Sequence, residues 1–233
     1  LYDLAFLLMD LWTAGERRAA NVVLNRYLNL RRVQEDLTGL SLLPLFLSTR
    51  AGVRALVTAD LAHELALKNS MKERGQALDW FRASISYLKP PSPRLVCIGG
   101  LSGTGKSRLA AALAPEIGAA PGALHIRSDV ERKVLAGVPE AERLPQGHYS
   151  REMSFAVYET CLARAEKALT AGHSVVLDAV FAEAEERRRA ESVAQNTGAA
   201  FDGVWLEAPA EVLKSRVAAR RGDASDATLE VVE

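Results

Sequence analysis

The feature that most constrains the fold of this chain is an eight-residue segment, GLSGTGKS, at positions 100–107. It matches the pattern GxxxxGK[ST] in full, and the apolar run RLVCIG at 94–99 precedes it. Glycines let a backbone wrap closely around phosphate oxygens, and the helix that follows such a turn points its N-terminal amides at the anion. The segment therefore predicts a strand, a phosphate-binding turn and a helix in succession.

This turn supplies the groups that hold the phosphates of ATP. We expect Lys106 to reach the β- and γ-phosphates and the Ser107 hydroxyl to bind Mg²⁺. ATP and Mg²⁺ are therefore the expected cofactors. The residues that we expect to contact the nucleotide form one unbroken stretch, namely Gly100, Leu101, Ser102, Gly103, Thr104, Gly105, Lys106, Ser107 and Arg108.

Short apolar runs alternate with helical patterns through the rest of the second half. The runs predict strands at 94–99, 123–127, 174–177 and 201–206. Helices are expected between them at 106–113, 151–170 and 183–197, and a last helix at about 209–221. This alternation predicts an α/β fold, a P-loop NTPase whose parallel sheet is covered by helices.

The first half has a different pattern. Residues 1–89 are expected to be helical throughout, and the three prolines at 90–93 predict a stiff, extended linker. We therefore divide the chain into a helical segment at 1–89, a Pro-rich linker at 90–93 and a P-loop domain at 94–233. Because the chain opens at Leu1 within an apolar helix, we expect it to be a fragment of a longer polypeptide. We also expect the P-loop domain to be incomplete at its C-terminus.

Composition restricts the class of partner. The chain has 233 residues with 29 basic and 29 acidic side chains, so its formal net charge is zero. A neutral protein has no overall attraction for nucleic acid or for an anionic membrane. The longest apolar runs are too short to span a bilayer, and the two cysteines indicate a reducing compartment. We expect a cytoplasmic protein without nucleic-acid or membrane partners.

Two aspartates follow predicted strands at the sheet edge where ligands bind in open α/β folds. Asp129 lies just after the second strand, in the segment SDVE at 128–131 that resembles a capping box. A carboxylate there can accept the proton of a substrate hydroxyl, and Arg132, one turn later, can hold an anionic or hydroxylated substrate. Asp178 closes the run VVLD at 175–178, which is typical of a magnesium-binding aspartate.

Basic residues gather on the last predicted helix. Arg216 and Arg220 are four residues apart and so share a helical face. Cationic side chains on a lid can clamp the charge that develops on a transferred phosphoryl group. We expect both arginines to be catalytic, together with Lys106 and Asp129. A solvated basic helix face is the alternative interpretation.

From 94 onward the chain resembles the AAA-type group of small P-loop kinases, which includes relatives of gluconate kinase and of 5′-hydroxyl polynucleotide kinases. The segments that carry this resemblance are GGLSGTGKS at 99–107, RSDVERK at 127–133, VVLDAVF at 175–181 and VWLEAPAEVLKSRVAARRGDASDAT at 204–228. The resemblance implies Asp129 as proton acceptor, Arg132 as substrate contact, and Arg216 and Arg220 as lid arginines. The usual fifth strand and nucleotide-base loop are absent from this chain, so no adenine contact is assigned.

The first half is similar to the tail of an aminoglycoside-phosphotransferase-like domain. The segments that carry this similarity are LYDLAFLLMDL at 1–11 and ANVVLNRYL at 20–28. In that family the catalytic aspartates precede this stretch, so the similarity implies a covalently linked upstream kinase-like domain. It also implies that residues 1–89 do not catalyse a reaction by themselves.

Together these features predict an ATP-dependent phosphotransferase that moves the γ-phosphate to a hydroxyl of a small molecule. Two other functions stay open: an ATP-binding or ATP-hydrolysing regulatory module, and a 5′-hydroxyl polynucleotide kinase. Asp129 distinguishes a kinase from a regulatory module, because a kinase needs a base beside the acceptor hydroxyl and a regulatory module does not. The zero net charge weighs against the second.

Overall fold

The computed structural model describes residues 1–64, 71–140 and 142–218. Its centre is a parallel sheet of four strands in the order β2-β3-β1-β4. The strands are β1 (Arg94–Gly100), β2 (Leu124–Arg127), β3 (Val175–Asp178) and β4 (Ala200–Leu206). Each lies within a residue or two of its predicted position. All four carboxyl ends therefore meet at one edge of the sheet, as in other open α/β folds.

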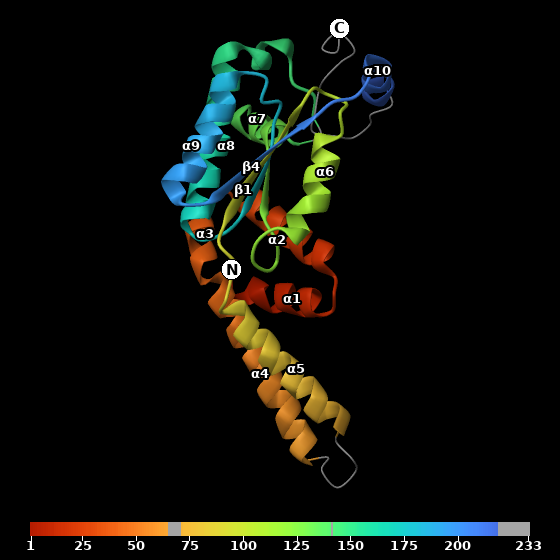
Figure 1. Cartoon of the computed structure of the whole chain (residues 1–233), viewed down its shortest axis with the longest axis vertical. Helices are drawn as coiled ribbons and strands as arrows, with labels where there is room; N and C mark the ends of the chain where they lie inside the picture. The colour runs from red at the N-terminus through yellow and green to blue at the C-terminus, as the bar shows by residue number, and fades with distance from the viewer. Residues whose placement is uncertain (65–70, 141, 219–233) are drawn as a thin grey trace.

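Helices cover both faces of this sheet, as the alternation predicts (Figure 1). Side chains alternate in direction along a strand, so neighbouring positions face opposite layers. Leu95 and Cys97 belong to the same buried cluster as the helices on one side, whereas Val96 and Ile98 pack with Ala110 of α6. The helices of this half are α6 (Lys106–Leu113), α7 (Ser128–Leu135), α8 (Arg151–Thr170), α9 (Ala184–Thr197) and α10 (Ala210–Ala218).

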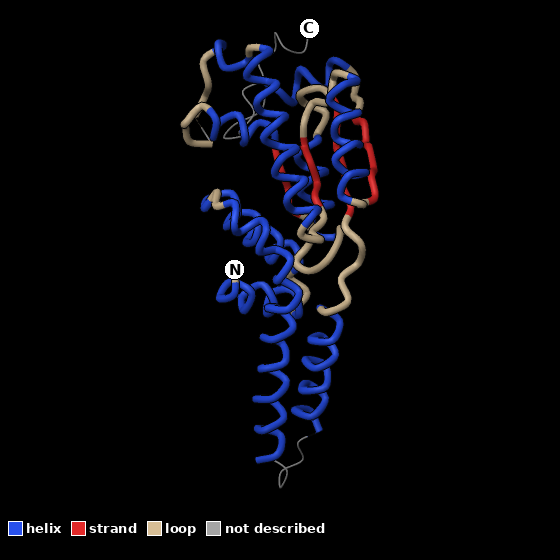
Figure 2. The backbone as a smooth tube through the Cα atoms, turned by 90° about the vertical axis from the view of Figure 1, so that its left-hand side faces the viewer, coloured by secondary structure: helices blue, strands red, loops and turns tan. Residues whose placement is uncertain are grey.

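The first half is helical, as expected. Its helices are α1 (Tyr2–Thr13), α2 (Arg17–Arg31), α3 (Gln34–Thr38), α4 (Leu43–Glu64) and α5 (Met71–Tyr87). Short 3₁₀ helices lie at Gly39–Leu42 after α3, at Ala114–Glu116 after α6, and at Gln146–Tyr149 between α7 and α8. In Figures 1 and 2, α4 and α5 form a two-helix arm that projects away from the sheet.

The helical half and the P-loop half share one hydrophobic core. Leu8, Leu24 and Leu43 belong to the same buried cluster as Leu124 and Val175 of the sheet. The proline-containing segment at 90–93 therefore joins two parts that are packed together.

Two asparagines of α2 satisfy the backbone at the start of edge strand β2. The Asn25 carboxamide oxygen accepts a hydrogen bond from the His125 amide at 2.6 Å, and its nitrogen donates to the Ala123 carbonyl at 3.1 Å. Asn21 donates to the carbonyls of Pro121 and Ala123 at 3.1 and 2.9 Å. An uncovered edge strand has unpaired polar groups, and here the helical half pairs part of them.

Replacing Asn25 by leucine is expected to lower the free energy of unfolding by about 1–3 kcal/mol, because the partly buried His125 amide loses its acceptor. Urea unfolding at neutral pH measures the change. Asn196→Ala, at an exposed position of α9, is the matched control and should leave stability within about 0.5 kcal/mol. Equal stabilities of the Asn25 variant and the control would contradict this account of the strand edge.

The helical half contains one apolar stretch that is longer than expected from the sequence. Among the described residues, the helical stretch Gln34–Glu64 is long enough to cross a membrane, and an 18-residue window within it is apolar enough, with a mean hydropathy of 1.4. The expectation that every apolar run is too short is therefore wrong by length and composition. Leu40, Leu43 and Leu47 of this stretch are nevertheless buried in the shared core. Core helices pass the same test, so this stretch is weak evidence for a membrane span.

A buried histidine between α8 and β3 makes the fold sensitive to acid. Burial lowers the pKa of His173 to about 4, against which a hydrogen bond with the Gly122 backbone acts. In the unfolded chain His173 has its ordinary pKa of 6.5. As the pH falls from about 6.5 toward about 4, the unfolded chain therefore binds a proton at His173 that the folded chain does not bind. From about pH 7 to about pH 5 this group should cost about 2 kcal/mol of stability. Urea unfolding at the two pH values should show a smaller loss of stability for His173→Asn than for wild type. Equal losses in the two proteins would contradict the prediction.

Candidate functional site

The turn between β1 and α6 has the backbone of a phosphate-binding loop. Gly100, Gly103 and Gly105 have φ angles of 135°, 89° and 97°, in the region that side chains rarely adopt. A Cβ atom at Gly100 would lie 2.4 Å from the Leu206 carbonyl oxygen, and one at Gly103 would lie 2.9 Å from that of Leu213. Conformation therefore favours glycine at all three positions, and space requires it at Gly100 and Gly103. The backbone amides of the turn and of the first turn of α6 fit an anion such as a nucleotide phosphate.

Side chains fix the shape of this turn. The Thr104 hydroxyl donates to the Leu101 carbonyl at 2.7 Å, and the Lys106 ammonium donates to the same oxygen at 2.9 Å. Lys106 thus lies across its own loop, at the first position of α6. An ammonium group there can exchange the carbonyl for phosphate oxygens within its reach. Ser107 follows on α6 and is partly buried, where its hydroxyl suits a hard cation such as Mg²⁺.

Asp129 and Arg132 both lie on α7, which begins directly after β2. Asp129 is in the first turn of this helix and is partly buried. Arg132 donates to the His148 carbonyl at 3.0 Å and lies 3.4 Å from the Ser154 hydroxyl. Its guanidinium carbon is 5.0 Å from the centre of the Tyr149 ring. Arg132 therefore joins α7 to the loop before α8, and any contact with a substrate is made from that position.

The predicted capping box at 128–131 is wrong. The N-cap of α7 is Arg127, Ser128 is already helical, and no side chain makes a capping hydrogen bond there. Glu131 is buried and pairs with Arg32 and Arg164. A true capping box occurs instead at Glu183 and Glu186 of α9. A buried carboxylate near two arginines finds stronger partners than a single backbone amide.

Asp178 is buried at the end of β3, with 4% of its surface exposed. Its carboxylate lies 3.7 Å from the Arg127 Nε and 3.9 Å from the His125 Nε2, both on neighbouring strand β2. Its role as a magnesium ligand stays a prediction. In the part of the chain that the structure describes, no group of three or more His, Cys, Asp or Glu side chains could hold a metal. An ion that enters with ATP would take further ligands from phosphate and water.

The last described helix, α10, lies against the phosphate-binding turn. Arg216 donates to the Gly103 carbonyl at 3.3 Å, and a Cβ at Gly103 would also meet Val217 of the same helix. The structure thus places one of the two predicted lid arginines beside the predicted nucleotide site. Arg220, the other, lies outside the described residues.

The segment after β3 adjoins the phosphate-binding turn. It belongs to VVLDAVF at 175–181, in which a role is predicted from the sequence only for Asp178. The Val180 carbonyl accepts a hydrogen bond from the Gly100 amide at 3.1 Å, and Phe181 has a φ angle of 55°. The Tyr158 hydroxyl of α8 accepts from the Phe181 amide at 2.8 Å. Burial raises the pKa of Tyr158, so the hydroxyl stays neutral. A positive φ at a bulky residue needs such support, and no sequence pattern indicates it.

The cysteines carry no nucleophilic chemistry here. Both are buried and free. Burial raises the pKa of the Cys97 thiol to about 12 and that of Cys161 well above its ordinary value. Thiols of this kind stay protonated at neutral pH and react slowly.

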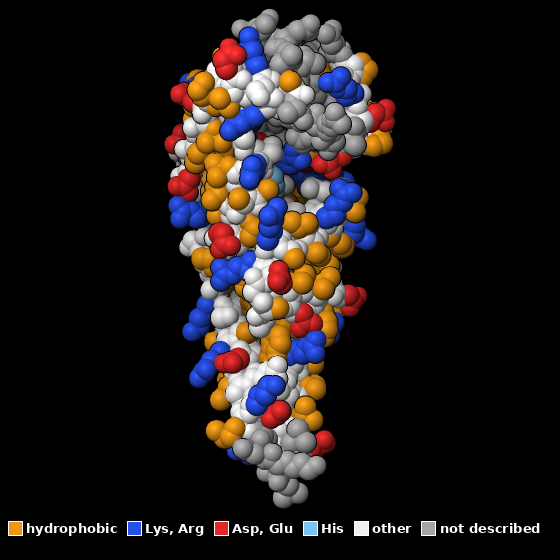
Figure 3. Space-filling view, turned by 90° about the vertical axis from the view of Figure 1, so that its right-hand side faces the viewer, with side chains coloured by type: hydrophobic (Ala, Val, Ile, Leu, Met, Phe, Trp, Pro, Cys, Tyr) orange, Lys and Arg blue, Asp and Glu red, His pale blue; other side chains and the backbone are white. Residues whose placement is uncertain are grey.

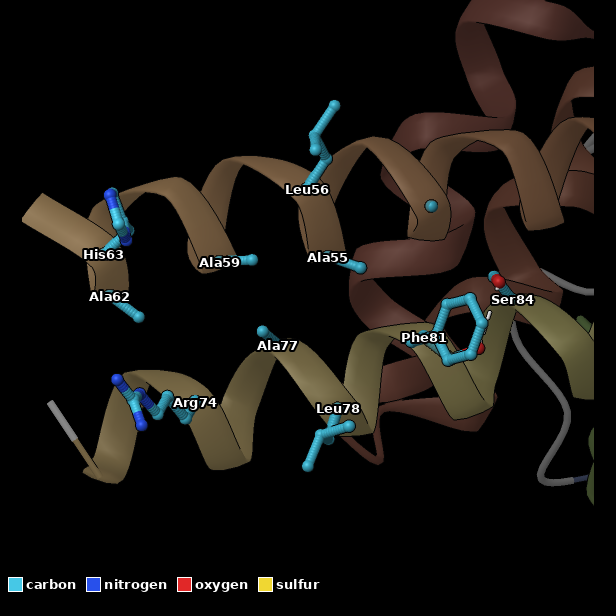
Figure 4. Close-up of a pocket in the computed structure, with 11 residues that line it drawn as sticks. Ala55, Leu56, Ala59, Ala62, His63, Arg74, Ala77, Leu78, Phe81 and Ser84 are labelled. Atoms are coloured by element: carbon cyan, nitrogen blue, oxygen red, sulfur yellow. Dashed lines mark hydrogen bonds between the residues drawn. The ribbon is translucent and has the colours of Figure 1, made fainter.

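A cavity of about 670 Å³ lies elsewhere, between α4 and α5 of the arm. Figure 4 shows its small alanine side chains, with His63 and Arg74 toward the tip of the arm. Figure 3 shows both positive and negative side chains on the face that it presents. Neither feature brings groups of the predicted chemistry together, so the candidate site remains the carboxyl edge of the sheet.

Comparisons with known proteins show the family of this chain. Residues 95–233 match the AAA domain family. Uncharacterized proteins of Mycobacterium tuberculosis and Mycobacterium bovis are 33% identical over 238 residues, a match that covers 98% of this chain and 45% of each relative. The chain therefore spans less than half the length of the curated relatives that it matches. The structure of the Mycobacterium tuberculosis APS kinase in complex with AMPPNP and APS is 22% identical, with a TM-score of 0.38 over 54% of this chain and 69% of that chain.

Proposed function

We propose that this chain, which belongs to the AAA domain family, is an ATP-dependent phosphotransferase that acts on a hydroxyl of a small molecule. One observation carries the proposal. The phosphate-binding turn after β1 and the helix that bears Asp129 after β2 leave the same edge of one parallel sheet, separated by β3. A turn of this kind binds the nucleotide, and a carboxylate on the neighbouring helix serves the acceptor.

The proposed chemistry is direct transfer. Asp129 accepts the proton of the acceptor hydroxyl, and the acceptor oxygen attacks the γ-phosphorus of ATP. The bond from that phosphorus to the bridging oxygen breaks, and ADP leaves with the electron pair. Lys106 and Arg216 hold the phosphate oxygens, and Arg132 orients the acceptor. Bound Mg²⁺, for which Ser107 and Asp178 are the proposed ligands, neutralises phosphate charge.

The test is a screen for acceptor-dependent ADP release from MgATP. Sugars, aminoglycosides, nucleosides and 5′-hydroxyl oligonucleotides are each offered to the purified protein in a coupled assay. Release with a sugar, aminoglycoside or nucleoside supports the proposal. Release with the oligonucleotide alone would favour a polynucleotide kinase, and release that no acceptor stimulates would favour an ATP-hydrolysing regulatory module.

The remaining expectations about the whole protein are also proposals. The similarity of residues 1–89 to the tail of an aminoglycoside-phosphotransferase-like domain supports an upstream kinase-like domain as a covalent partner. The neutral formal charge supports a small-molecule acceptor rather than nucleic acid or a membrane. The buried, reduced cysteines support a cytoplasmic location.

A further inference from the structure

A buried charge cluster joins the helical half to the helix that bears Asp129. The Glu131 side chain is 1% exposed, and its two carboxylate oxygens have different partners. Oε2 accepts from the Arg32 Nη1 at 2.5 Å, and Oε1 lies 3.4 Å from the Arg164 Nε. Arg32 comes from the end of α2, Glu131 from α7 and Arg164 from α8. Three separate elements thus meet at one carboxylate.

Further contacts hold the two arginines in place. Arg32 is the C-cap residue of α2, with a left-handed backbone at a φ of 54°. Its Nε donates to the Asn29 carbonyl at 2.9 Å. The Asn29 side chain in turn accepts from the Arg164 Nη2 at 3.1 Å. The network is therefore closed, because Asn29 of α2 contacts both arginines that contact Glu131.

Helix α7 depends on outside contacts for its position. It has eight residues, and so short a helix is not stable on its own. It also has no side-chain cap at its N-terminus. Glu131 lies two residues after Asp129 and directly before Arg132, so whatever fixes Glu131 fixes both. Arg132 also contacts His148, Tyr149 and Ser154, all of which belong to the P-loop half.

We propose that Arg32 and Glu131 are positioning residues, through which the helical half sets the orientation of α7 and so of Asp129 and Arg132 at the acceptor side of the site. The inference rests on the proposed function for its effect on transfer. Its structural part, the dependence of α7 on Arg32, does not need that function. The helical half thereby controls acceptor use and leaves nucleotide binding to the turn between β1 and α6.

The physical basis is the cost of a buried charge without a partner. Burial lowers the pKa of Arg164, the Glu131 carboxylate opposes that shift and Arg32 adds to it. Glu131→Gln leaves two arginines facing each other without a counter-charge. Arg32→Gln leaves Glu131 with Arg164 alone. Either single change already removes the contact between Arg32 and Glu131. The double variant loses that contact only once, so it should be less disturbed than the sum of the single changes.

The experiment compares Arg32→Gln, Glu131→Gln and the double variant with wild type. Amide hydrogen exchange of residues 128–135 reports α7, that of residues 106–113 reports α6, and calorimetry gives the MgATP affinity. Arg32→Lys tests rescue by a conserved charge. Glu116→Gln is the matched control, since it breaks an ion pair with Arg17 that also joins the two halves, at 3.1 Å, but is exposed.

Arg32→Gln and Glu131→Gln should each speed exchange in α7 by about tenfold or more, with exchange in α6 and the MgATP affinity within about threefold of wild type. Arg32→Lys should recover part of the protection, and Glu116→Gln should resemble wild type. The acceptor panel described above should show loss of kcat/KM for the acceptor with an unchanged KM for ATP. Equal acceleration in α6 and α7, or additive effects in the double variant, would overturn the proposal. If wild type uses no acceptor, the proposed function fails, and the exchange data still decide the role of the cluster.

Discussion

Replacing Lys106 by alanine is expected to reduce ATP-dependent turnover by about 10²- to 10³-fold. In the structure its ammonium group already lies over the phosphate-binding turn, 2.9 Å from the Leu101 carbonyl. No other described lysine lies in this turn. The variant removes a charge that neutralises the β- and γ-phosphates, and it should weaken MgATP binding as well. The coupled assay measures turnover, and calorimetry measures affinity.

The matched control is Lys89→Ala, an exposed lysine before the linker. It removes the same charge from the same protein at a site that is outside the proposed machinery. Turnover and affinity should equal those of wild type. A Lys106→Ala protein that keeps more than about a third of wild-type turnover would refute the assignment of the turn at 100–107 as the nucleotide site.

Replacing Asp129 by asparagine is expected to separate binding from chemistry. The change keeps the size of the side chain and removes the group that accepts the proton of the acceptor hydroxyl. Acceptor-dependent transfer should fall by about 10²- to 10⁴-fold, the usual contribution of a positioned base. MgATP affinity should stay within about threefold, because the phosphates bind at another helix.

Asp79→Asn serves as control, since Asp79 is exposed on α5 and pairs with Arg82, three residues later on the same helix. Full transfer by the Asp129 variant would show that another group accepts the proton. Loss of MgATP binding together with transfer would instead show that Asp129 acts through the fold. The two outcomes have different consequences. After the first, α7 can still bind the acceptor, but Asp129 is not the proton acceptor.

Local patterns in the sequence predicted the strands and the turn. Strand β1 and the turn at 100–107 are contiguous, so their glycine spacing and apolar run are readable in one stretch. The cap of α8 is equally local, since the Ser150 hydroxyl accepts a hydrogen bond from the Met153 amide at 3.2 Å. Such features depend on neighbours within a few residues, where propensity and sterics act directly.

The assignment of Glu131 to a capping box failed for the opposite reason. The pattern at 128–131 is local, but the partner that Glu131 takes is Arg32, which is 99 residues away in the chain. The proximity of Arg127 to Asp178 is likewise not readable from the sequence, because it exists only once β2 pairs with β3. No periodicity or spacing encodes which distant charges become neighbours.

The sequence by itself determined the nucleotide-binding turn, the order of strands and helices, and the residue types available at the carboxyl edge. It did so because each follows from contacts along the chain. Only the tertiary structure decided that the helical half shares the core of the sheet, that Asn25 pairs with β2, and that Glu131 links α2 to α7. Those contacts arise when buried polar groups find partners across the fold, and their identity depends on how the elements pack in three dimensions.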